Sequence, residues 1–151
     1  MANTYTQIYV QFVFSVSKRS PLIPETIKNE LEQYMCGIIK SIGCTPHAIY
    51  CNPDHLHVLI GINKALSISD TMKIVKSKSS KFINQKYPNT KFYWQTGYAA
   101  FSYSYSQIDD VNKYILNQKK HHQKRSYGEE LIDFLKKYNL DFDEKYLFEI
   151  D

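Results

Sequence analysis

The sequence predicts an α+β fold: an antiparallel sheet in β-α-β-β-α-β order, followed by one additional helix toward the C-terminus. Segments rich in Tyr, Ile, Val and Phe alternate with segments whose apolar residues recur at helical spacing. Stretches that contain Pro, Gly or Asn separate these segments and indicate turns. The length of 151 residues suits one domain with a core of ordinary size.

The first half of the chain reads as strand, helix and hairpin. Residues 5–16 are rich in aromatic and β-branched residues whose side chains alternate between two faces, which predicts a long strand. Residues 24–42 carry apolar side chains at helical spacing, and Gly43 is expected to end that helix. Residues 45–51 and 55–62 are predicted strands, and the Asn-Pro-Asp turn between them makes a hairpin.

The second half repeats the helix and the strand and then adds a further helix. Residues 69–86 form the next predicted helix, capped by Ser69 and Asp70 at its first residues. A strand is expected from about residue 98 to 105, and a helix over 107–122 with acidic residues in its first turn. Six of these elements follow the order of ferredoxin-like (RRM-like) folds, and helix 107–122 is the addition.

The composition points to a soluble cytoplasmic protein. No run of 18 apolar residues is present, so we expect no membrane span. The first residues lack a basic segment followed by an apolar stretch, which argues against a secretory signal. The three cysteines, Cys36, Cys44 and Cys51, form neither an even set nor a C-x-x-C motif, which favours free thiols in a reducing compartment.

Charge divides the chain into two parts. Residues 126–151 hold eight acidic residues against three lysines, a net charge of −5, which leaves +9 for residues 1–125 out of a total of +4. We therefore expect a catalytic or binding domain over 1–125 and an acidic tail over 126–151. A basic body suggests a polyanionic partner, although many cytoplasmic domains are mildly basic without one. The role of the tail, which shows helical character over 129–138, is left open.

The most informative motif is His55-Leu56-His57 within the predicted strand at 55–62. Side chains two residues apart on a strand project from the same face, so both imidazoles point the same way. Such a pair can bind one metal ion. The alternative is a half-exposed strand whose polar side chains face water.

A second polar group lies on the helix at 107–122. Tyr114 and Gln118 are four residues apart and share a helix face, with His121 nearby. Taken alone, this pattern also suits a helix that turns polar groups to solvent. Combined with the strand motif, two imidazoles and the Gln118 oxygen could hold a divalent cation. Tyr114 would then be placed to attack a phosphorus atom polarised by that cation.

Three motifs in register carry a resemblance to a known family. His55-Leu56-His57 resembles the HUH motif, in which U is a hydrophobic residue. The stretch at 114–122 resembles the nucleophile helix of single-tyrosine HUH transposases of the insertion-sequence 200/605 type (TnpA-like), which include the REP-associated tyrosine transposases. Residues 92–102, Phe-Tyr-Trp-Gln-Thr-Gly-Tyr-Ala-Ala-Phe-Ser, resemble that family's stretch between the two motifs. The resemblance covers about residues 5–125.

The resemblance implies a function and a role for each site residue. His55, His57 and Gln118 would be ligands of Mg²⁺ or Mn²⁺, and imidazole donors favour Mn²⁺ slightly. Tyr114 would be the catalytic nucleophile, which forms a 5′-phosphotyrosine and leaves a 3′-hydroxyl. The substrate would be single-stranded DNA with hairpin ends, without a nucleotide cofactor. The protein would be a homodimer, with the tyrosine helix of the other subunit as one source of the nucleophile.

Further residues are candidates for DNA contact, and two alternative functions stay open. The candidates for DNA contact are Lys73, Lys76, Lys78, Lys81, His121 and His122. For the lysines, a solvated helix face explains the pattern equally well. The first alternative is a domesticated relative that nicks host hairpin repeats. The second, less favoured, is a ferredoxin-like nucleic-acid-binding module without catalysis.

Overall fold

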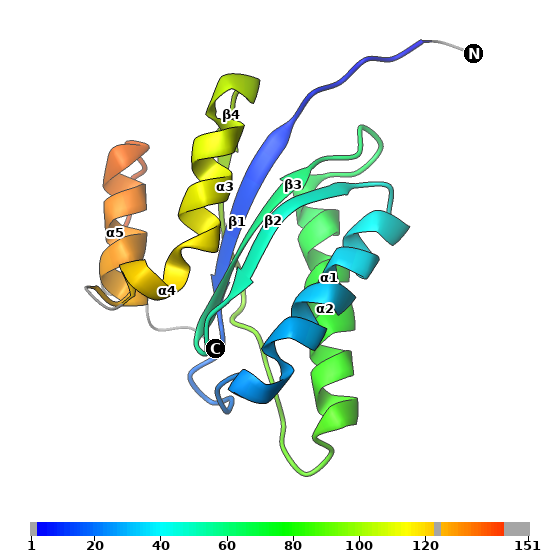
Figure 1. The fold of residues 1–151 in the computed structure, drawn as a ribbon, viewed down its shortest axis with the longest axis vertical. Coiled ribbons are helices and arrows are strands. Elements are labelled where there is room, and N and C mark those ends of the chain that lie inside the picture. Colours follow the sequence, from blue (N-terminus) through cyan, green and yellow to red (C-terminus); the bar gives the residue numbers. More distant parts are fainter. Residues whose placement is uncertain (1–2, 123–124, 144–151) are drawn as a thin grey trace.

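A computed structural model describes residues 3–122 and 125–143. Its sheet has four antiparallel strands in the order β2-β3-β1-β4. The strands are β1 (Tyr9–Ser15), β2 (Thr45–Cys51), β3 (His55–Gly61) and β4 (Ala99–Tyr103). This strand order and the intervening helices confirm the predicted ferredoxin-like arrangement (Figure 1).

Helices α1 (Lys28–Ser41) and α2 (Ile68–Lys86) cover one face of the sheet (Figure 1). A short 3₁₀ turn, η1 (Glu25–Ile27), leads into α1. Every second side chain of β1 and β3, including Phe12, Phe14 and Leu56, is buried in the core beneath these helices. The α2 N-cap is Ser67, two residues before the predicted cap, and its hydroxyl accepts a hydrogen bond from the Asp70 amide.

The other face of the sheet carries α3 (Ile108–Leu116), α4 (Gln118–His121) and α5 (Tyr127–Lys137), with the 3₁₀ turn η2 (Tyr105–Gln107) before α3 (Figure 1). A second apolar cluster joins α5 to the sheet. Its buried members are Val13, Phe101, Leu131, Phe134 and Leu135. The segment expected to be a tail therefore contributes a helix that packs on the sheet.

On this face one expectation is corrected and one alternative is excluded. The predicted helix 107–122 is interrupted, because α3 ends at Leu116 and Asn117 (φ −98°, ψ 21°) separates it from α4. Strand β3 does not have a wet face, since all its residues from His55 to Ile60 are buried. Helices on both sides of the sheet exclude water from both faces of its two central strands.

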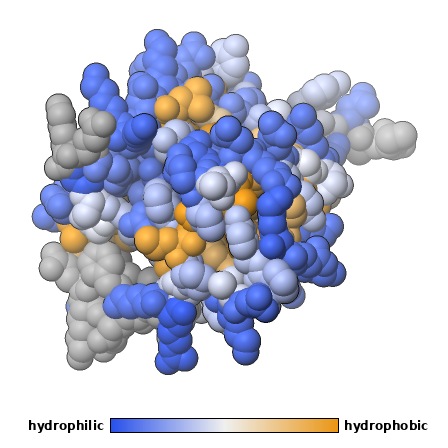
Figure 2. All heavy atoms as spheres, turned by 60° about the horizontal axis from the view of Figure 1, so that its bottom comes forward, coloured by the Kyte–Doolittle hydropathy of each residue, from blue (hydrophilic) through white to orange (hydrophobic). Residues whose placement is uncertain are grey.

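The surface is mostly hydrophilic, with apolar side chains gathered in smaller patches on the face drawn in Figure 2. Among the residues that the structure describes, no helix combines the length and apolar character needed to cross a bilayer. The cysteines are free thiols, with Cys44 and Cys51 buried and Cys36 partly exposed.

Candidate active site

The register of the sheet turns both histidines of the strand motif toward α3 and α5. On β1, Ser15 pairs with His55 and Val13 pairs with His57, so these four side chains share one face. Both imidazoles are almost fully buried, and their ring centroids lie 5.2 Å apart. The predicted common orientation of the two histidines is therefore present, on a covered face of the sheet.

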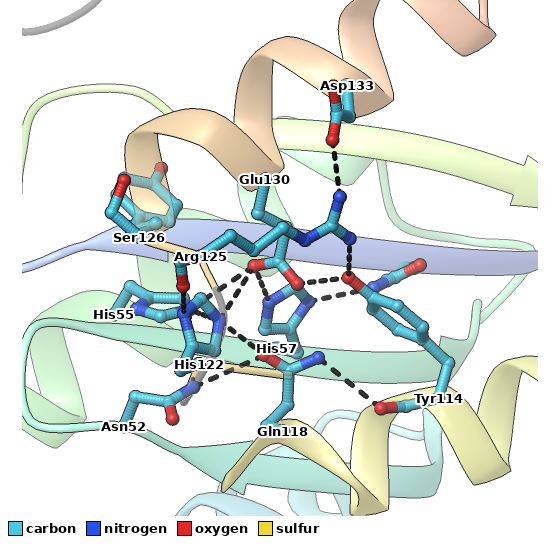
Figure 3. A network of polar contacts seen from close by, with 12 residues as sticks. Asn52, His55, His57, Tyr114, Gln118, His122, Arg125, Ser126, Glu130 and Asp133 are labelled. Atoms are coloured by element: carbon cyan, nitrogen blue, oxygen red, sulfur yellow. Dashed lines mark hydrogen bonds and ion pairs between the residues drawn. The ribbon is translucent and has the colours of Figure 1, made fainter. Parts of the chain in front are cut away.

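Glu130 of α5 places a carboxylate at the centre of this face (Figure 3). Its Oε1 lies 2.8 Å from His57 Nε2 and 3.4 Å from His55 Nε2. The residue is 0% exposed. Neighbouring apolar side chains of α5 are packed against the sheet, which sets the depth at which Glu130 enters the site. A buried carboxylate is costly without partners, and the histidines supply them.

His122, directly after α4, adds a third imidazole. Its Nε2 lies 3.1 Å from His55 Nε2 and 3.1 Å from Glu130 Oε1. The ligand atoms of His55, His57, His122 and Glu130 all lie within 4.8 Å of one another. Three imidazoles and one carboxylate converging at this spacing form a donor set that suits a divalent transition metal. These residues therefore fit the metal that the strand motif implies.

Further contacts orient the two strand histidines. His55 Nδ1 lies 2.7 Å from an Asp54 carboxylate oxygen, which directs His55 Nε2 into the cluster. The side-chain amide of the buried Gln11 lies 2.9 Å from His57 Nδ1 and directs His57 Nε2 the same way. The carboxylate partner of His55 is typical of metal-binding histidines, which donate their second ring N–H to an acceptor. His57 differs, because its Nδ1 accepts a hydrogen bond from the Gln11 amide.

Tyr114 projects from α3 to the edge of the same cluster (Figure 3). Its hydroxyl donates a hydrogen bond to Glu130 Oε2 and accepts one from the Arg125 guanidinium at 3.1 Å. Its ring lies 6.0 Å from the His57 ring and stacks on His121 at 4.5 Å between centroids. Glu130 therefore contacts the histidines with one oxygen and the tyrosine with the other.

Gln118, the first residue of α4, is fully buried beside the cluster. Its Oε1 lies 2.9 Å from His122 Nε2 and accepts a weak bond from Asn52 at 3.5 Å. Its amide nitrogen donates to the Tyr114 carbonyl oxygen at 3.3 Å. The structure thus brings all four predicted site residues together in one chain, with the Gln118 oxygen toward His122.

Burial and hydrogen bonds shift the pKa values of these groups in different directions. Burial lowers the pKa of His55, but its bonds to Asp54 and Glu130 outweigh burial and raise it. For His57, burial dominates and lowers the pKa. Burial would raise the pKa of Glu130, yet its bonds to both histidines hold it well below the ordinary range. Burial and the adjacent Glu130 raise the pKa of Tyr114. These shifts favour the anionic form of Glu130 and the neutral form of Tyr114.

The lysines proposed to contact DNA lie on a different layer. Lys73, Lys78 and Lys81 are exposed on α2, which packs on the sheet face opposite to Tyr114 (Figure 1). Lys76 is half-buried, and its Nζ donates to the carbonyl oxygens of Gln95, at 2.8 Å, and Gly97. DNA contact by these side chains, and by His121 and His122, stays a prediction.

Sequence reasoning missed Glu130 and Arg125. One local signal existed: Ser126 and Glu129 form a capping box that starts a helix at Tyr127. On that helix Glu130 lies four residues before Phe134 and thus on its apolar face. An acidic residue on the apolar face of a helix indicates a buried partner, although it does not identify that partner.

Comparisons with known proteins identify a family and a fold. A family model described as "Transposase IS200 like" matches residues 4–118. None of the curated proteins compared with the chain matches it. A transposase candidate from Deinococcus radiodurans R1 has a similar structure, with a TM-score of 0.62 and 18% identity over 78% of this chain and 95% of that one.

A second similar structure is a REP-associated tyrosine transposase bound to a REP hairpin. The TM-score is 0.57, with 13% identity over 81% of this chain and 73% of that one. At these identities the two structures support the fold, whereas the family model covers most of the chain. The chain therefore belongs to the family of IS200-like transposases.

Proposed function

We propose that this protein cleaves and rejoins single-stranded DNA at hairpin ends in a metal-dependent transposition reaction, with Tyr114 as the nucleophile. The main observation behind the proposal is that one carboxylate contacts both the histidine cluster and the tyrosine hydroxyl. Glu130 touches His57 with Oε1 and the Tyr114 hydroxyl with Oε2. Phosphoryl transfer to a phenol needs a nearby metal that activates the phosphate, and the residues beside Tyr114 are of the kinds that bind metals.

We assign the metal to His55, His57, His122 and Glu130, with Gln118 beside His122. This set keeps two of the three ligands expected from the sequence and adds His122 and the carboxylate. A divalent cation, Mn²⁺ or Mg²⁺, would polarise the scissile phosphate as a Lewis acid and offset the charge of Glu130. Imidazole donors favour Mn²⁺.

The protein's own groups would position and activate the phenol. Arg125 lies beside the Tyr114 hydroxyl, where a guanidinium can hold a phosphate oxygen. The Tyr114 oxygen would form a bond to phosphorus as the bond to the 3′ oxygen breaks. The phenolic proton would leave along the hydrogen bond to Glu130 Oε2 and pass to solvent, because the low pKa of Glu130 keeps that carboxylate ionised. The leaving strand gains a proton and ends in a 3′-hydroxyl. The reverse attack by another 3′-hydroxyl rejoins DNA and frees the tyrosine.

A hairpin-repeat nickase is the second candidate, supported by the similarity to a REP-associated transposase bound to a REP hairpin. The same residues would serve both functions, so the DNA around the gene discriminates between them. Paired hairpins that bracket the gene favour transposition, whereas dispersed single hairpins favour the nickase. Homodimer formation, with a nucleophile from the second subunit, stays a prediction, and the contacts within one chain support assembly in cis.

The test is formation of a covalent adduct. The full chain is incubated with Mn²⁺ and single-stranded hairpin oligonucleotides copied from the DNA that flanks its gene, and products are resolved under denaturing conditions. We expect an adduct that disappears in Tyr114→Phe and persists in Tyr105→Phe, a matched control at an exposed tyrosine. His57→Ala should also abolish it. Absence of an adduct with all the flanking hairpins would refute the catalytic proposal and favour a binding module.

A further inference from the structure

A cavity of about 430 Å³ lies between α3, α5 and the sheet, and Tyr114 and Arg125 form part of its wall. Tyr103 and Phe134 add aromatic surface, while Asp110 and Lys137 add charged groups. This cavity is separate from the candidate metal site, because none of the three histidines of that site lines the cavity. Its volume is within the range of pockets that hold small organic ligands.

The cavity begins where a captured phosphate would be. Arg125 donates to the Tyr114 hydroxyl and also pairs with Asp133, another residue of the cavity wall. A phosphate attached to Tyr114 would therefore lie beside a guanidinium that faces the cavity. The group that stays bonded to that phosphate must occupy adjacent space, and the cavity is adjacent.

The cavity wall is also connected to the cluster by hydrogen bonds. The Tyr103 hydroxyl donates to Gln11 Oε1 at 2.8 Å, and the Gln11 amide contacts His57 Nδ1 at 2.9 Å. Gln11 is fully buried, so its two contacts hold Tyr103 in a defined position relative to His57. A ligand against Tyr103 would thus be placed accurately with respect to the reacting phosphate.

We infer that this cavity binds the nucleoside on the 3′ side of the cut, whose 5′ phosphate becomes attached to Tyr114. The inference rests on the proposed function and adds a subsite to it. The base would lie against the aromatic surfaces of Tyr103 and Phe134. The Asp110 carboxylate would accept a hydrogen bond from an amino or imino group at the base edge.

Binding of mononucleotides tests the subsite without turnover. The full chain with Mn²⁺ is titrated with the four deoxynucleoside 5′-monophosphates and with 2-deoxyribose 5-phosphate, which lacks a base, and binding is followed by isothermal titration calorimetry. We expect at least one nucleotide to bind about tenfold more tightly than the sugar phosphate, as one stacked base would give. Asp110→Trp should fill the cavity and remove that preference. Asp109→Trp, an exposed neighbour outside the cavity with the same charge loss, should keep it.

Equal binding of nucleotides and sugar phosphate would overturn the inference, as would an unchanged preference in a folded Asp110→Trp protein. A second measurement uses a cleavable hairpin with one abasic position directly 3′ or directly 5′ of the cut. We expect KM to rise about tenfold for the 3′ position, with little change for the 5′ position. An adduct that forms equally well with both would reject the subsite and leave the proposed function intact. No adduct with any substrate would reject the function itself.

Discussion

Replacing Glu130 by Gln should weaken Mn²⁺ binding more than any other single change of charge in this protein. Glu130 supplies the carboxylate of the cluster, and its Oε1 lies within 3.4 Å of three imidazole nitrogens. Loss of a group that merely orients a ligand lowers metal affinity about 10- to 100-fold. Loss of the anionic donor itself should lower Mn²⁺ affinity by at least the upper value of that range, about 100-fold, which corresponds to about 2.7 kcal/mol of binding free energy.

The assay is titration of the full chain with Mn²⁺, with the free ion followed by electron paramagnetic resonance. Glu129→Gln is the matched control, because a glutamine at that exposed position can preserve the capping box of α5. The reasoning is refuted if Glu130→Gln binds Mn²⁺ within threefold of the unmodified chain. If Gln118→Ala loses binding instead, the ligand set expected from the sequence is correct.

Three further predictions test assembly, thiol chemistry and packing. Mixing Tyr114→Phe with His57→Ala should restore no adduct if Tyr114 acts on the cluster of its own chain, which it contacts through Glu130; recovery on a denaturing gel would show assembly between subunits. Burial raises the pKa of Cys51 to about 12, so its thiolate, which forms only as pH approaches that value, is scarce at pH 8. Iodoacetamide should therefore leave Cys51 unmodified until urea unfolds the chain, and mass spectrometry that finds early labelling would contradict this burial. Phe134→Ala should lower the free energy of unfolding by about 3–5 kcal/mol, measured in urea, because the ring stacks on Phe101 at 5.0 Å. It should also reduce adduct yield by loosening α5, and a loss below 1 kcal/mol would show that α5 is not packed as described.

Local periodicity predicted most of the fold. The strand expected over 45–51 is observed as Thr45–Cys51, and the strand expected over 55–62 as His55–Gly61. These elements were readable because side-chain alternation is a property of a few consecutive residues. The break in the helix at Asn117 could not be predicted, because the residues around it retain helical spacing. In the structure this break places Gln118 beside His122.

The sequence by itself determined that His55 and His57 share a face, that Tyr114 and Gln118 are neighbours on a helix, and that both pairs resemble one family's motifs. Only the tertiary structure decided that these pairs meet, that their face of the sheet is dry, and that Glu130 lies between them. Glu130 is separated from His57 by 73 positions and joined to it by a 2.8 Å contact. No local pattern specifies such a contact, because it depends on the docking of α5 through Leu131, Phe134 and Leu135 against the sheet. That apolar packing sets the position of α5. The imidazoles of His55, His57 and His122 at that position offset the cost of burying the Glu130 carboxylate.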